Sequence, residues 1–151
     1  MTIEERLHQL ESIEAIKQLK ARYLSACDRK QTDIMRDCFV ETEAHIDYGN
    51  VGQFNHRDGL IDVFNELGNH EYIIDMHHGQ NPQIQIIDSN TATGNWQLYF
   101  QQINKKENTL TQLGGFYDDI YTYTQEGWRI KSTRFTVTSQ LTTALPAKGT
   151  D

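Results

Sequence analysis

The strongest constraint on the fold is a change of hydrophobic period part-way along this 151-residue chain. Up to residue 70, apart from a short alternating run at 44–48, apolar residues recur every three or four positions, which is the period of an amphipathic helix. From residue 72 they follow the alternation of β-strands, with short polar turns between the runs. Helices gathered ahead of hairpin-linked strands predict an α+β fold, in which the helices pack on the concave face of a curved antiparallel sheet.

Three helices are predicted in the first part of the chain. The first begins at a capping box formed by Thr2 and Glu5 and ends in the polar segment 28–31. A short second helix follows Thr32, and a third spans 56–67 before a glycine stop signal. The apolar face of the first helix consists of residues three or four positions apart: Ile3, Leu7, Leu10, Ile13, Ile16, Leu19, Tyr23 and Cys27.

The strands are predicted from alternation and from the turns that separate them. A first strand at 44–48 lies between the second and third helices, and 51–55 is predicted to be a loop. The paired glycines Gly114 and Gly115 predict a bulge or bend inside a long strand. The remaining strands are expected at 72–78, 84–87, 91–103, 109–124 and 128–142.

Composition narrows the classes of function. The net charge is −7 and no block of Lys or Arg occurs, so nucleic acid is not an expected partner, because neutralised phosphates supply most of that affinity. No apolar run approaches the ~20 residues that cross a bilayer, and the N-terminus has no apolar signal core. We expect a cytoplasmic protein with one domain over 1–142 and a flexible tail over 143–151.

The residues that bind metals or carry redox chemistry form no recognisable motif. Cys27 and Cys38 make no C-x-x-C pair, and we expect them to be buried free thiols, with a disulfide between them as the open alternative. None of the six histidines has metal-ligand spacing with a carboxylate. No nucleotide-binding or nicotinamide-binding fingerprint occurs. Neither a metal nor a cofactor is therefore expected.

Several short motifs follow one another in a specific order. This order, from Ile3 to about Thr142, resembles the SnoaL-like branch of the nuclear transport factor 2-like superfamily. The resemblance implies a cone-shaped α+β domain around a pocket for a small organic molecule, and a homodimer. The motifs are YLSACD (23–28), DYG (47–49), HHGQNP (77–82), TATGNW (91–96), GFYDDIY (115–121), GWRI (127–130) and the following Arg134.

The resemblance also implies site residues. In dehydratases of this superfamily, a tyrosine and an aspartate at the end of the first helix move protons together with a histidine from a strand. Tyr23, Asp28 and His77 match these positions, and Arg134 matches an arginine of the bile-acid dehydratases. The middle strand of those enzymes carries a second histidine or an aspartate, whereas here its end reads Gln101-Gln102.

The two adjacent histidines point to opposite faces of their strand, so only one of them enters the pocket. Alternation alone turns His78 inward, whereas the spacing of the family favours His77, which we take as the base. Packing in the core is the competing interpretation for Trp96 and Phe100. The residues expected to bind substrate are Tyr48, Trp96, Phe100, Gln102, Tyr117 and His78.

The first functional hypothesis is a cofactor-free lyase or isomerase, similar to a dehydratase or cyclase. Its substrate would be a small hydroxy-ketone or a polyketide-like or steroid-like molecule. His77, supported by Asp28, removes a proton beside a carbonyl, and Tyr23 with Tyr48 or Arg134 stabilises the enolate.

The alternative is a non-catalytic ligand-binding or dimerisation module, which the missing second acid or base on the middle strand favours. A His–Asp pair beside an empty cavity would favour the enzyme, and a cavity filled by Trp96, Phe100 and Leu98 would favour the module. A third option is an epoxide hydrolase with an Asp–Arg–Asp set, for which Asp119 is the only candidate second carboxylate. The outer sheet face is the expected dimer interface, with contributions from Thr133, Phe135, Val137, Thr138 and Gln140.

Overall fold

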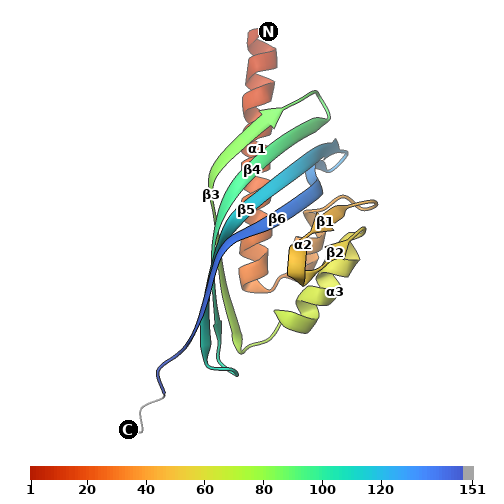
Figure 1. The fold of residues 1–151 in the computed structure, drawn as a ribbon. Helices are drawn as coiled ribbons and strands as arrows, with labels where there is room; N and C mark the ends of the chain where they lie inside the picture. The colour runs from red at the N-terminus through yellow and green to blue at the C-terminus, as the bar shows by residue number, and fades with distance from the viewer. Residues whose placement is uncertain (148–151) are drawn as a thin grey trace.

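The computed structural model describes residues 1–147 and shows helices packed on a curved sheet (Figure 1). The sheet order is β2-β1-β6-β5-β4-β3, and every neighbouring pair is antiparallel except β1 with β6. The predicted α+β fold is therefore confirmed. The elements are α1 (Ile3–Arg29), α2 (Thr32–Asp37), β1 (His45–Asp47), η1 (Gly49–Val51), β2 (Gln53–Phe54), α3 (Arg57–Leu67), β3 (Ile73–Ile86), β4 (Thr91–Asn104), β5 (Thr109–Thr124) and β6 (Gly127–Ala144).

Helix α1 begins and ends as its sequence indicates. The Thr2 hydroxyl accepts the Glu5 amide, the Glu5 carboxylate accepts the Thr2 amide, and Lys30 closes the helix in the left-handed conformation. The predicted apolar face is wrong over its first part, because Figure 1 shows the first turns of α1 projecting past the sheet. The side chains left exposed there are Ile3, Leu7 and Leu10.

The edge of the sheet is one long strand rather than two. Strands were predicted at 72–78 and 84–87 with a turn at Asn81, but β3 runs continuously from Ile73 to Ile86. Asn81 takes a φ of 52° inside an irregularity of the β3–β4 register between Gln80 and Gln83. A bulge absorbs the left-handed residue, so the strand bends without ending.

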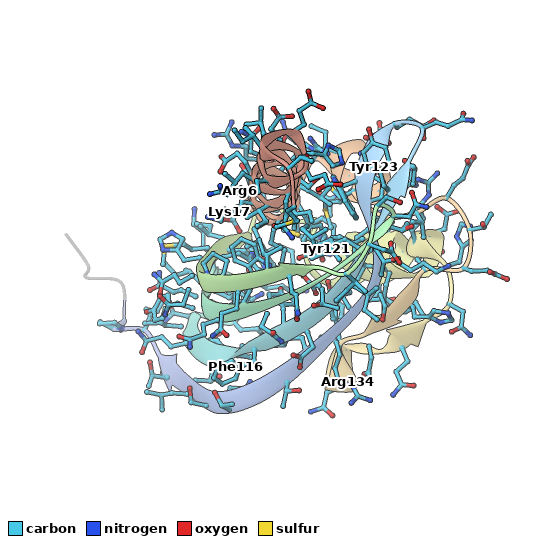
Figure 2. All side chains as sticks on the ribbon, turned by 90° about the horizontal axis from the view of Figure 1, so that it is seen from above. Arg6, Lys17, Phe116, Tyr121, Tyr123 and Arg134 are labelled. Atoms are coloured by element: carbon cyan, nitrogen blue, oxygen red, sulfur yellow. The ribbon has the colours of Figure 1, made fainter. Side chains whose placement is uncertain are left out.

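A bulge in β6 changes which side chains face inward. Ile120 pairs with Ser132 while Tyr121 pairs with Ile130, so Lys131 is an extra residue in β6. After this residue the inward positions shift by one, and Thr133 rather than Arg134 is buried. The inward position expected for Arg134 is therefore wrong. Figure 2 shows Arg134 and Phe116 on the side of the sheet away from α1, with Tyr121 between the sheet and α1.

The other predicted boundaries need small corrections. The segment predicted as a loop at 51–55 contains the end of η1 and the two-residue strand β2. The register shift expected at the paired glycines is confirmed, since it lies between Gly114 and Gly115. Thr143 and Ala144 belong to β6 rather than to a tail, and residues 148–151 of the predicted tail lie outside the described residues.

The core lies between α1 and the inner face of the sheet. Both cysteines are buried there as free thiols. Within residues 1–147, no helix combines the length and the apolar content needed to cross a membrane. The buried stripe of α1 consists of Ser12, Ile16, Leu19, Lys20, Tyr23, Leu24, Ala26 and Cys27.

Candidate functional site

A cavity of about 550 Å³ opens between the helices and the lower half of the sheet. This volume lies within the range of pockets that hold small organic ligands. Most of its lining is apolar or aromatic, including Leu98, Phe100 and Leu113. The polar or titratable side chains on its wall are Tyr23, Cys27, Tyr48, Asn50, Asp75, His77, Gln102, Asn104, Tyr117 and Gln140.

His77 on this wall is hydrogen-bonded to Asp28, which itself lines the neighbouring groove between α1 and β3. Asp28 lies in the last turn of α1, and its Oδ1 lies 2.6 Å from His77 Nδ1. Both carboxylate oxygens of Asp28 also accept the backbone N–H of His77, at 3.0 and 3.1 Å. An ionised carboxylate only accepts hydrogen bonds, so the proton of the neutral ring lies on Nδ1. The other ring nitrogen, Nε2, is thus left as a lone-pair acceptor.

The His77 ring is also held by packing. It lies 4.7 Å from the Phe100 ring, and its side chain retains 16% exposure. His78 points to the opposite face and is exposed, beside a second, open groove between α1 and β3. Of the two adjacent histidines, His77 is therefore the one that meets both Asp28 and the cavity.

Two tyrosine hydroxyls meet on the cavity wall. Tyr23 Oη from α1 and Tyr48 Oη lie 2.8 Å apart, so one donates to the other. Burial raises the pKa of both phenols, so both keep their protons at neutral pH. Whichever hydroxyl accepts has its own proton free for another acceptor, and the pair can donate one hydrogen bond to a ligand.

A second carboxyl group, that of Asp75, lies on the same wall. Gln102 stands directly across from it in the β3–β4 register and donates from Nε2 to Asp75 Oδ1 at 3.0 Å. Burial raises the pKa of Asp75, while Gln102 and the neighbouring His77 partly oppose that rise. Gln102 was expected to bind substrate, and its amide is engaged by this carboxyl group.

Behind the cavity, a fully buried ion pair connects α1 to β5. Lys20 Nζ lies 2.8 Å from Asp119 Oδ2, and neither side chain has any exposed surface. Asp119 also accepts the hydroxyls of Tyr121 and Thr133, each at 2.6 Å. Lys20 Nζ lies 3.5 Å from the centre of the Tyr117 ring, which forms part of the cavity wall. Every polar atom of this cluster thus has a close partner.

Besides His78, two residues expected in the pocket lie elsewhere. The Arg134 side chain is 69% exposed, and its Nε lies 3.4 Å from Asp47 Oδ2 on the outer surface. Trp96 is buried outside the large cavity, where its indole N–H donates to Tyr121 Oη at 3.0 Å. Phe100 and Tyr117 line the cavity as expected. With Arg134 outside and Asp119 paired to a lysine, the Asp–Arg–Asp set of an epoxide hydrolase is not assembled.

The bulges of β6 also change which face of the sheet the residues expected at a dimer interface occupy. Thr133 is buried, and three others line the cavity instead of the outer face: Phe135, Val137 and Gln140. Among residues 1–147, no group of three or more His, Cys, Asp or Glu side chains is arranged to hold a metal ion.

This geometry can be compared with known proteins. The family model of the SnoaL-like domain matches residues 8–134. The chain belongs to the SnoaL-like family. The resemblance inferred from the sequence motifs is therefore confirmed.

Three solved structures are similar over nearly the whole chain. A protein provisionally assigned as a scytalone dehydratase, from Novosphingobium aromaticivorans, has a TM-score of 0.79 and 20% identity over 93% of this chain and 92% of that chain. The hexachlorocyclohexane dehydrochlorinase LinA-type3, from Novosphingobium barchaimii, has a TM-score of 0.82 and 16% identity over 92% and 94%. A structure of LinA has a TM-score of 0.84 and 17% identity over 95% and 99%. At these identities the likeness establishes the fold.

Sequence reasoning missed the importance of Asp75 and Lys20 in this SnoaL-like chain. Asp75 lies two positions before His77, so alternation places it on the same strand face. Lys20 lies four residues after Ile16 and three before Tyr23, which puts it on the buried stripe of α1. A charged residue on an apolar helix face was the signal that identifies a buried ion pair.

Proposed function

We propose that this SnoaL-like protein is a cofactor-independent lyase or isomerase for a small ring-bearing hydroxy-ketone or a polyketide-like or steroid-like molecule. The observation that carries the proposal is the 2.6 Å contact between His77 Nδ1 and Asp28 Oδ1 at the wall of an open cavity. A carboxylate on one ring nitrogen orients the imidazole, makes the other nitrogen a better base and stabilises the protonated ring.

The proposed reaction begins with proton removal beside a carbonyl group. His77 Nε2 takes the proton, and the negative charge moves to the carbonyl oxygen as an enolate. The hydrogen-bonded hydroxyls of Tyr23 and Tyr48 supply a donor for that oxygen. In a cavity with mostly apolar walls, such a donor stabilises developing charge more strongly than in water.

The enolate can then expel a leaving group on the next carbon, or return the proton at another carbon and so move a double bond. Two of the similar structures carry names of elimination enzymes, a dehydratase and a dehydrochlorinase. Those names support the elimination branch for this chain. The non-catalytic alternative is less favoured, because Trp96 lies outside the cavity and about 550 Å³ remains open.

We also propose a homodimer through the outer face of the sheet. Three large side chains on the adjacent strands β4 and β5 are exposed there: Tyr99, Phe116 and Ile120. Sedimentation velocity should show a dimer that the variant Phe116→Asp converts to monomer. A wild-type monomer at all protein concentrations up to about 100 μM would contradict this part of the proposal.

Proton removal can be tested without knowing the leaving group. In D₂O, the protein should accelerate exchange of the α-hydrogens of cyclohexanone or of the larger 2-decalone, followed by proton NMR. His77→Gln should reduce the accelerated rate about 10²–10⁴-fold, which is the usual contribution of a general base. His78→Gln is the matched control, since it removes the neighbouring, exposed histidine. Exchange no faster than in buffer, or equal loss in both variants, would refute the proposal.

A further inference from the structure

The cavity wall holds a carboxyl group that the proposed base does not use. Asp75 and His77 are two positions apart on β3 and both line the cavity. Two residues along a strand span about 6–7 Å, so the two side chains stand side by side on one face. That separation is large enough for adjacent carbon atoms of one substrate to face both groups.

The surroundings of Asp75 differ from those of Asp28. Asp28 accepts the His77 ring and backbone N–H, an arrangement that suits a charged carboxylate. Asp75 Oδ1 accepts the Gln102 amide, and among residues 1–147 no hydrogen bond reaches Oδ2. Burial is the largest cause of the raised pKa of Asp75, and Asp28 adds to it, whereas Gln102, His77 and Lys30 oppose it.

Two carboxyl groups whose environments differ in this way commonly take different roles in one active site. Asp28 orients the base. Asp75 can hold a proton on Oδ2 while Oδ1 stays fixed by Gln102. We propose that Asp75 is the general acid that protonates a departing hydroxyl group, so that the preferred substrate class is a β-hydroxy ketone. This inference rests on the proposed function of His77.

The need for an acid depends on the leaving group. Chloride leaves as a stable anion, whereas hydroxide is a poor leaving group and departs readily only as water. In the proposed step, His77 Nε2 takes the α-proton, and the electrons of that C–H bond form the new C=C bond by way of the enolate. The C–O bond breaks, its electron pair stays on oxygen, and that oxygen takes the proton of Asp75.

The step balances without any other reactant. The substrate becomes an enone and one water molecule. His77 is left protonated and Asp75 is left ionised, so the charge of the protein is unchanged. Proton exchange with water through the open cavity returns both groups to their starting states. Gln102 donates to Asp75 Oδ1 in either state, which keeps the acid in place throughout.

Three ring ketones separate the acid from the base. Cyclohexanone in D₂O reports proton removal alone, 3-chlorocyclohexanone adds a leaving group that needs no proton, and 3-hydroxycyclohexanone adds one that does. Both eliminations give cyclohexenone, which is followed by its ultraviolet absorbance and corrected for the uncatalysed rate. Asp75→Asn keeps the shape of the side chain but cannot donate the acid proton. Asp62→Asn on α3 is the control, because Asp62 is exposed.

We expect Asp75→Asn to reduce elimination of water about 10²–10⁴-fold, while chloride elimination and hydrogen exchange change less than about threefold. In the wild-type protein, water elimination should decline as pH rises through the pKa of Asp75, and the variant should lack that decline. The charged groups facing Asp75 in this range are Asp28, His77 and Lys30.

Two results would overturn the assignment of Asp75 and leave the base in place. One is an equal loss of water and chloride elimination in Asp75→Asn, which is what a purely structural role predicts. The other is a wild-type protein that catalyses exchange and chloride elimination but not water elimination. Failure of the proposed function itself looks different, because then exchange of cyclohexanone is not accelerated and His77→Gln changes nothing.

Discussion

Lys20 and Asp119 form an ion pair inside the core, 2.8 Å apart, with no exposed surface on either side chain. Burial lowers the pKa of Lys20, and the adjacent Asp119 carboxylate opposes that change. Removing the two charges from water costs free energy that offsets much of their mutual attraction. Its position matters because Asp28 lies eight residues further along the same helix, about 12 Å by helical rise. The pair joins α1 to β5 at a defined point, and it thereby positions Asp28 relative to the sheet.

Replacing one partner of this pair should lower the free energy of unfolding more than replacing both partners. Asp119→Asn keeps only one of the two oxygens that accept the Tyr121 and Thr133 hydroxyls, and it leaves the Lys20 ammonium unpaired, which we expect to cost about 3–5 kcal/mol in the free energy of unfolding. The double variant Lys20→Met with Asp119→Asn should recover part of that loss. Urea unfolding measures both. A double variant that is less stable than the single one would contradict this account.

The hydrogen bond from His77 to Asp28 fixes the tautomer of the ring. When the His77 ring is neutral, we expect its proton on Nδ1, because the Asp28 carboxylate can only accept. Nitrogen-15 NMR of labelled histidine distinguishes the two ring nitrogens. In Asp28→Asn the amide can donate as well as accept, so the preference for Nδ1–H should weaken and turnover should fall. A proton on Nε2 in the wild-type protein would exclude Nε2 as the base.

The tyrosine pair should act as one unit. Because Tyr23 Oη and Tyr48 Oη share a hydrogen bond, removing either hydroxyl disturbs the donor that faces the ligand. We expect Tyr23→Phe and Tyr48→Phe each to reduce kcat about 10²–10³-fold, and the double variant to lose little more than either single one. Tyr123→Phe is the control, since that side chain is 52% exposed. Fully additive losses would show two independent donors.

The pH dependence of protein stability should reveal the buried carboxyl group of Asp75 without any substrate. Because burial raises its pKa above the usual 3.8, the folded protein binds this proton more tightly than the unfolded chain does. Its stabilising contribution is therefore present below about pH 4 and is lost as pH rises through the folded pKa. Relative to wild type, Asp75→Asn should gain stability over that rise, as measured by thermal unfolding. A difference that does not change with pH would contradict the desolvated carboxyl group.

The order of elements could be predicted from sequence because it rests on local patterns, whereas the pairing of His77 with Asp28, 49 residues apart, was expected from the family resemblance. The capping box at Thr2, the helical period and the spacing of the HHGQNP motif are all readable along the chain. The direction of the His77 side chain could not be predicted from alternation, because the pattern with Met76 and Ile74 favoured His78. The family spacing corrected what periodicity alone assigned.

Apart from the register shift at Gly114 and Gly115, the interruptions of the strands could not be predicted. The left-handed Asn81 reads as a turn in sequence, yet neighbouring β4 continues to pair on either side of it. Whether a chain turns or bulges depends on a partner strand that a local pattern does not contain. Lys20 was missed for a related reason, since its counterion Asp119 lies 99 residues away in the sequence.

The extra residue Lys131 sets which side chains of β6 face the inside of the sheet. Every side chain that β6 contributes to the cavity lies beyond it, and if Lys131 were taken into regular alternation instead of bulging, Arg134 and Thr136 would replace Phe135 and Val137 on the inner face. Deletion of Lys131 would remove the bulge and leave the same side chains facing inward. The polarity of the cavity wall on β6 therefore depends on whether Lys131 bulges, so the same sequence could line an apolar or a polar cavity.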